Sequence, residues 1–94
     1  MRFFNSCSSK FWEWGDEVFT GGLPAQFMYF IVRGRVATYC LDTQDKKRVH
    51  LFVEGSHFGV NDIIKKRKRQ ETVYAEEDTE LWLISAKDIM QIMA

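Results

Sequence analysis

Cysteine is scarce in this sequence, and neither sign of charge is in excess. Cys7 and Cys40 are the only cysteines among 94 residues, and two cysteines make neither a disulfide framework nor a zinc site. The 13 Lys and Arg residues balance 13 Asp and Glu residues, so the formal net charge is zero. We therefore expect no nucleic-acid binding and no membrane binding through a strongly basic surface of the whole chain.

Long apolar runs are missing as well. No run approaches the roughly 18 residues that a membrane-spanning helix needs. The start of the chain, residues 1–6, also lacks the apolar stretch of a secretory signal. These absences predict an intracellular, cytoplasmic protein that makes no membrane contact through this chain.

The composition is typical of a small folded domain. Hydrophobic residues make up 46% of the chain and aromatic residues 15%, which is enough apolar surface for one hydrophobic core. We place an N-terminal extension at residues 1–12 and a single domain at residues 13–94.

Short segments rich in β-branched and aromatic residues follow one another along the chain, separated by glycines and polar turns. They span residues 17–20, 27–32, 35–41, 49–53, 72–75 and 80–84, with a polar hairpin loop at 42–48. Strands of this length and spacing predict a mainly β fold, a sandwich or a barrel. We expect Trp82 to be buried because it lies within the last of these strands.

Two short helices fit the remaining residues. Residues 61–66 begin with Asn-Asp and end with two lysines, an order that suits the helix dipole. Ser85 is a predicted N-cap with Asp88 three residues later, followed by an apolar face. The sequence stops at Ala94, so we expect the domain to be cut short within this C-terminal helix.

The stretch at residues 55–73 holds the most informative side chains. Phe58 and Gly59 precede the first predicted helix, and a glycine there lets the backbone approach a ligand closely. A helix start favours a phosphate, and Arg69, ten residues after Gly59, could bind one through two hydrogen bonds. Taken alone, this pattern is more typical of a strand-to-helix corner with solvated charges than of a phosphate site.

Five segments, in their order along the chain, carry a family resemblance. They are Gly-Asp-Glu-Val-Phe at 15–19, Met-Tyr-Phe-Ile-Val-Arg-Gly at 28–34, Phe-Val-Glu-Gly-Ser-His-Phe-Gly at 52–59, Arg-Gln-Glu-Thr-Val at 69–73 and Leu-Trp-Leu-Ile-Ser-Ala-Lys-Asp at 81–88. Over about residues 13 to 93 the chain resembles the cyclic nucleotide-binding domain family. The resemblance implies a jelly-roll-like β-roll, a double-stranded β-helix, with a short phosphate-cassette helix and a C-terminal helix. It also implies a regulatory module that binds cAMP or cGMP.

The resemblance also implies where the ligand binds. The phosphate would lie on the backbone of Gly59 and Val60, and Arg69 would clamp it. The residues placed at the ligand are Phe58, Gly59, Val60, Asn61, Arg69, Gln70, Glu71 and Thr72. Val49 and Leu51 would face the purine. Because Arg69 would serve the ligand, we expect Arg69→Ala to abolish binding and to leave the fold intact.

Two departures from the family pattern weaken the predicted binding. Val60 stands where the family has a glutamate that accepts a hydrogen bond from the ribose, and valine cannot accept one. Gln70 and Glu71 replace a pair of small residues, and the Glu71 carboxylate would repel the phosphate. An interaction module that has lost its ligand therefore remains an alternative. The sensor half of a bacterial transcription regulator is another.

The other features predict no separate chemistry. Five consecutive basic residues at 65–69 are typical of a solvated helix end, and a nuclear-localisation or nucleic-acid patch is the functional alternative. His50 and His57 lack partners at metal-ligand spacing, and no nucleophile motif is present. We expect a protein that is not an enzyme and uses no cofactor or metal. It would pass its signal through the C-terminal helix to an attached effector domain, in a longer chain that could form a homo-oligomer.

Overall fold

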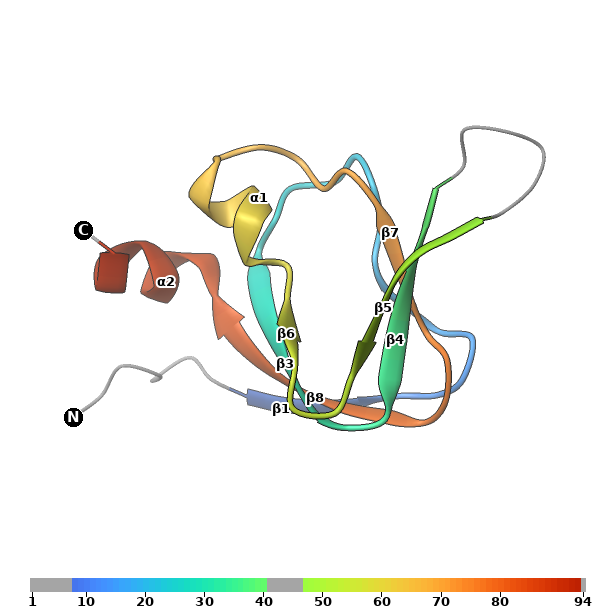
Figure 1. The fold of residues 1–94 in the computed structure, drawn as a ribbon. Coiled ribbons are helices and arrows are strands. Elements are labelled where there is room, and N and C mark those ends of the chain that lie inside the picture. Colours follow the sequence, from blue (N-terminus) through green and yellow to red (C-terminus); the bar gives the residue numbers. More distant parts are fainter. Residues whose placement is uncertain (1–7, 41–46, 94) are drawn as a thin grey trace.

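The computed structural model describes residues 8–40 and 47–93. Cys7, most of the predicted hairpin loop and Ala94 lie outside the described residues, so the predictions for them stay open. Figure 1 shows the strands wound into a roll, with two helices at one side of it.

Eight strands form two antiparallel sheets of four strands each. The first sheet has the order β1(Ser8–Trp12), β8(Thr79–Ser85), β3(Phe27–Arg33) and β6(His57–Phe58). The second sheet has the order β2(Glu17–Phe19), β7(Thr72–Ala75), β4(Arg35–Cys40) and β5(Lys47–Val53). The prediction of a mainly β roll is confirmed, because strands distant in sequence pair within both sheets.

Two strands of the roll were not among the predicted segments. β1 pairs with β8 from Ser8 opposite Leu83 to Trp12 opposite Thr79, so residues that we assigned to an N-terminal extension belong to the first sheet. Its first three residues are polar and exposed, which leaves no apolar alternation that could indicate a strand. β6 pairs Tyr29 with Phe58 over only two residues, too few for any periodicity.

The core lies between the two sheets and is built from alternate strand residues. Ile31, Leu81 and Val73 are fully buried, and the ring of Tyr29 stacks on that of Phe58 with centroids 5.1 Å apart. Trp82 is the exception to our expectation, because 46% of it is exposed. Strand residues alternate between faces, so burial of Leu81 and Leu83 turns Trp82 outward.

Two helices form a smaller apolar cluster beside the roll. α1(Val60–Ile64) follows β6, and α2(Ala86–Met93) follows β8. Ile63, Ile84 and Ile89 are buried here. The predicted N-cap is confirmed, since the Asp88 backbone N–H donates to Ser85 Oγ at 3.2 Å. None of the helices in the described part of the chain is long and apolar enough to cross a membrane.

Candidate functional site

The corner between β6 and α1 is set by Gly59. Its φ of +88° lies in the left-handed region, which a glycine adopts without a steric penalty. A Cβ at this position would lie 3.1 Å from Nη1 and 3.3 Å from Nη2 of Arg69. Glycine is therefore needed twice here, for the turn itself and for the guanidinium that packs against its backbone.

An inner cavity of about 430 Å³ opens between this corner and the second sheet. Its volume falls in the range of about 300–1,000 Å³ that is usual for small-molecule sites. The lining residues are Phe19, Thr38, His50, Phe52, Phe58, Gly59, Asn61, Asp62, Arg67, Gln70, Glu71 and Val73. Aromatic rings thus form one part of the wall, and polar and charged groups of residues 59–71 form another.

The cavity brings together most of the residues that the sequence predicts at the ligand. Phe58, Gly59, Asn61, Gln70 and Glu71 line it. Val60, Arg69 and Thr72 do not.

Val60 and Thr72 have other contacts. Val60 packs against the apolar cluster of α1 and α2 and is not among the residues that line the cavity. The hydroxyl oxygen of the buried Thr72 accepts a hydrogen bond from the Gly21 N–H at 3.0 Å, which ties β7 to the turn after β2.

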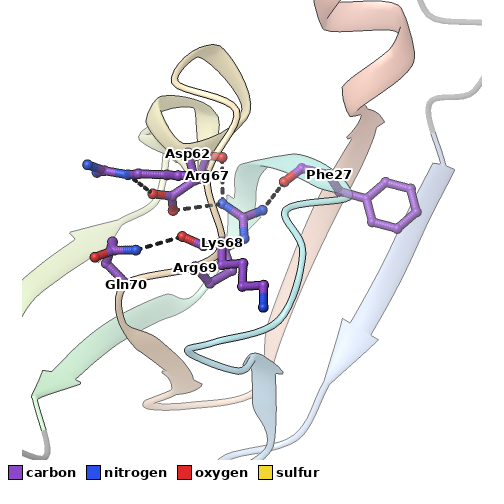
Figure 2. Close-up of polar contacts among 7 residues, drawn as sticks. Phe27, Asp62, Arg67, Lys68, Arg69 and Gln70 are labelled. Atoms are coloured by element: carbon purple, nitrogen blue, oxygen red, sulfur yellow. Dashed lines mark hydrogen bonds and ion pairs between the residues drawn. The ribbon is translucent and has the colours of Figure 1, made fainter.

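Arg69 is buried, with only 1% of its side chain exposed. Nη1 donates to the Gly59 carbonyl at 2.6 Å and to Asp62 Oδ2 at 3.4 Å, and Nη2 donates to the Phe27 carbonyl (Figure 2). The guanidinium also lies over the ring of Phe19, 3.9 Å from its centroid. Arg69 therefore links β6, α1 and the start of β3 from inside the molecule.

The electrostatics of this buried cation follow from its surroundings. Burial lowers the pKa of the Arg69 guanidinium, and the hydrogen bond to Asp62 opposes that change. Burial likewise raises the pKa of the nearby Tyr29 hydroxyl, while the charge of Arg69 lowers it. An arginine stays protonated even with a lowered pKa, so the interior holds a permanent positive charge.

This placement changes what we expect from removal of Arg69. The side chain satisfies two backbone carbonyls and part of one carboxylate, so Arg69→Ala would leave buried acceptors without donors. We therefore expect Arg69→Ala to destabilise the fold, whereas the sequence alone led us to expect an intact fold.

Two charged residues that sequence reasoning missed lie at the cavity. Arg67 Nε donates to Asp62 Oδ1 at 2.7 Å, and 42% of the Arg67 side chain is exposed. Arg67 thus presents a cation on the cavity wall, whereas Arg69, which we expected there, does not line the cavity. In the sequence, Arg67 is one of five adjacent basic residues, and the sequence alone does not indicate which of the five faces a cavity.

The wall supplied by β5 also differs from the prediction. His50 and Phe52 line the cavity, whereas Val49 and Leu51 are 44% and 45% exposed and take no part in the lining. Alternation along a strand explains the difference, because burial of Phe52 against Phe58 fixes which face of β5 points inward.

The charges around the cavity are mixed. Asp62 and Glu71 contribute carboxylates, and Arg67 contributes a cation that Asp62 already neutralises in part. Among the described residues no cluster of His, Cys, Asp or Glu could hold a metal ion. The geometry therefore suits an organic molecule with an apolar part facing the aromatic wall and a polar part facing residues 59–71.

Comparison with known proteins places the chain among relatives. The family model described as the cyclic nucleotide-binding domain matches residues 9–94. A protein of Rhodopseudomonas palustris, provisionally named as a potassium channel protein, is 35% identical over 82 residues, which are 87% of this chain and 20% of the relative. The chain thus spans about a fifth of the length of that relative.

Solved structures show the same fold at low sequence identity. A Ruegeria pomeroyi protein, described as a cyclic nucleotide binding protein, has a TM-score of 0.88 at 18% identity, over 95% of this chain and 40% of its own. The regulatory domain of Toxoplasma gondii protein kinase A, crystallised with cAMP, has a TM-score of 0.87 at 16% identity, over 96% and 35%. The regulatory subunit of a cAMP-independent protein kinase A from Trypanosoma brucei has a TM-score of 0.81 at 20% identity, over 95% and 36%.

Proposed function

The chain belongs to the cyclic nucleotide-binding domain family, and from this membership we propose that it is a regulatory module that binds cAMP or cGMP in the inner cavity. The observation that carries the proposal is the cavity itself, whose wall is built from the β6–α1 corner and residues 67–71. The aromatic wall of Phe19, Phe52 and Phe58 would take the purine, and the backbone of Gly59 and Asn61 would face the phosphate.

Two arginines can supply the positive charge that the phosphate needs. Arg67 already lines the cavity and could turn from Asp62 to a ligand oxygen. Arg69 lies behind Gly59, and it would have to exchange its two carbonyl acceptors for phosphate oxygens. We propose that Arg67 makes the first contact, and that this exchange by Arg69 accompanies tight binding.

A change in the acceptors of Arg69 would affect α2 through two neighbouring backbone carbonyls. Arg69 holds the Phe27 carbonyl, and the carbonyl of the preceding residue, Gln26, accepts a hydrogen bond from the Ala86 N–H at 2.8 Å. Ala86 is the first residue of α2. Release of Phe27 would therefore loosen the anchor of this helix, which would carry the signal to an attached effector domain.

A second function, an interaction module without a ligand, is favoured by three observations. Val60 packs in the helix cluster, both terminal nitrogens of Arg69 are occupied, and the acidic residue Glu71 lines the cavity. The fold does not require a response to cAMP, because one of the similar structures is the regulatory subunit of a kinase described as cAMP-independent.

Isothermal titration calorimetry with cAMP, cGMP and the non-cyclic control 5′-AMP separates the two functions. We expect saturable, micromolar binding of a cyclic nucleotide. Arg67→Ala should weaken it about tenfold, the effect of losing one charge-assisted hydrogen bond of about 1.4 kcal/mol. Glu71→Gln should strengthen it several-fold, and Glu77→Gln, which changes an exposed carboxylate outside the cavity, should leave it unchanged.

The opposite result would be silence up to millimolar nucleotide. If circular dichroism showed the same sample to be folded, the proposal of a nucleotide sensor would be wrong, and the ligand-free interaction module would stand.

A further inference from the structure

A second concave surface lies between α1 and α2, on the outside of the roll. This hollow has a volume of about 470 Å³, and its apolar floor is formed by Pro24, Ala25, Ile63, Ala86 and Met90. Such a surface exposes apolar atoms of both helices to water, which is the usual mark of an interaction site when it is concave and rimmed by charge.

The rim of the hollow is strongly basic. Lys66, Arg67, Lys68 and Lys87 surround the floor, and Asp62 is the one acidic residue among the lining side chains. Asp62 is already engaged by Arg67 and Arg69, at 2.7 Å and 3.4 Å. None of the three lysines has an ion-pair partner within the described part of the chain. The positive charge of the rim is therefore available to a partner.

Lys66 occupies a conformation that favours glycine. Its φ is +53°, and the turn closes with the Lys66 N–H on the Ile63 carbonyl at 3.1 Å and the Arg67 N–H on the Asp62 carbonyl at 3.0 Å. A left-handed residue in this helix-ending turn is most often glycine, and another residue costs about 1 kcal/mol. The chain keeps a cation at the rim although a glycine would form the same turn with less strain.

We propose that the hollow docks an acidic amphipathic helix of a partner protein. Apolar side chains at i and i+3 or i+4 of that helix would enter between α1 and α2, and carboxylates on its flanks would face Lys66, Lys68 and Lys87. An apolar floor distinguishes this partner from a nucleic acid, whose phosphates would use the rim alone. Concavity distinguishes it from a bilayer surface, which is flat on this scale.

The test uses the whole chain and a fluorescein-labelled designed peptide that carries leucines on one helical face and glutamates on the flanks. Fluorescence anisotropy should show saturable binding. Two control peptides accompany it, one of the same composition in scrambled order and one with lysine in place of glutamate. Both should bind at least tenfold more weakly.

Variants of the chain locate the site. The double variant Lys66→Glu with Lys87→Glu should lose at least tenfold in affinity, and Met90→Ser should lose severalfold. Lys10→Glu, which reverses an exposed charge on β1 outside the lining of the hollow, should leave the affinity unchanged.

Several results would overturn the proposal. They are absence of peptide binding, equal binding of the scrambled peptide, and an affinity that Lys66→Glu with Lys87→Glu does not alter. Binding of phosphatidylserine vesicles or of single-stranded RNA through the same lysines, with no binding of the peptide, would also overturn it and would identify the surface as one for membranes or nucleic acid.

Discussion

Arg67 and Arg69 are two residues apart and contact the same carboxylate, yet they belong to different regions of the molecule. The side chain of Arg69 is 1% exposed and is held by two backbone carbonyls inside the roll. The side chain of Arg67 is 42% exposed and has Asp62 as its partner at the surface. The basic run at residues 65–69 thus supplies one cation to the interior of the roll. Its other cations lie at the surface, at the inner cavity and at the hollow between α1 and α2.

Backbone pairing of the loop after β2 produces this difference. The Gly22 N–H donates to the Arg69 carbonyl at 2.7 Å, and the Arg69 N–H donates to the Leu23 carbonyl at 2.8 Å. These bonds hold residue 69 against the interior, while the residues before it stay at the surface. Residue type alone therefore does not decide whether an arginine of this family's cassette serves a ligand or the fold.

The largest effect on stability should come from truncation of Arg69, with truncation of Arg67 as its comparison. Arg69→Ala should lower the free energy of unfolding by about 3–5 kcal/mol, because it leaves buried polar groups unpaired. Arg67→Ala should lower it by less than about 1 kcal/mol, as for an exposed ion pair. Urea unfolding followed by tryptophan fluorescence measures both values. Similar losses in the two variants would show that Arg69 is not a structural element in solution.

The next effect concerns the glycine that makes room for Arg69. Gly59→Ala should be destabilised more than Gly55→Ala, although both glycines have φ of +88°. The conformational cost of about 1 kcal/mol is shared by the two variants. Only at Gly59 would the new Cβ approach the guanidinium of Arg69, whereas nothing lies within 4 Å at Gly55. Thermal unfolding of the pair checks this, and equal losses would mean that Arg69 does not pack on Gly59.

The smallest effect should be a gain at the surface. Lys66→Gly should stabilise the chain by about 0.5–1 kcal/mol, because glycine relieves the left-handed strain at φ +53°. Lys65→Gly is the matched control. Lys65 has φ of −81°, where glycine offers no relief and costs conformational entropy, so this variant should be less stable than the parent. Loss of stability in both variants would show that Lys66 is not strained in solution.

Sequence patterns predicted the roll, and several residues that they placed at the ligand line the inner cavity. The predictions that failed depend on contacts between distant parts of the chain. The strands rich in β-branched residues and the Ser85 cap were predicted correctly, since both depend on neighbours in sequence. The inward face of β5, the direction of Arg69 and the exposure of Trp82 depend on which residues of distant strands meet. Polar β1 and two-residue β6 form because β8 and β3 offer partners, which no local pattern records.

The most direct test of the account is an NMR titration of the ¹⁵N-labelled chain with cAMP and with cGMP. We predict that the Gly59 amide, on the cavity wall, and the Ala86 amide, at the start of α2, shift together and saturate with one dissociation constant. The Arg69 Nε–H signal should move with them as the guanidinium exchanges its acceptors. Saturation at Gly59 with no change at Arg69 and Ala86 would contradict the proposed path to α2. No shift at Gly59 at millimolar nucleotide would contradict the binding itself.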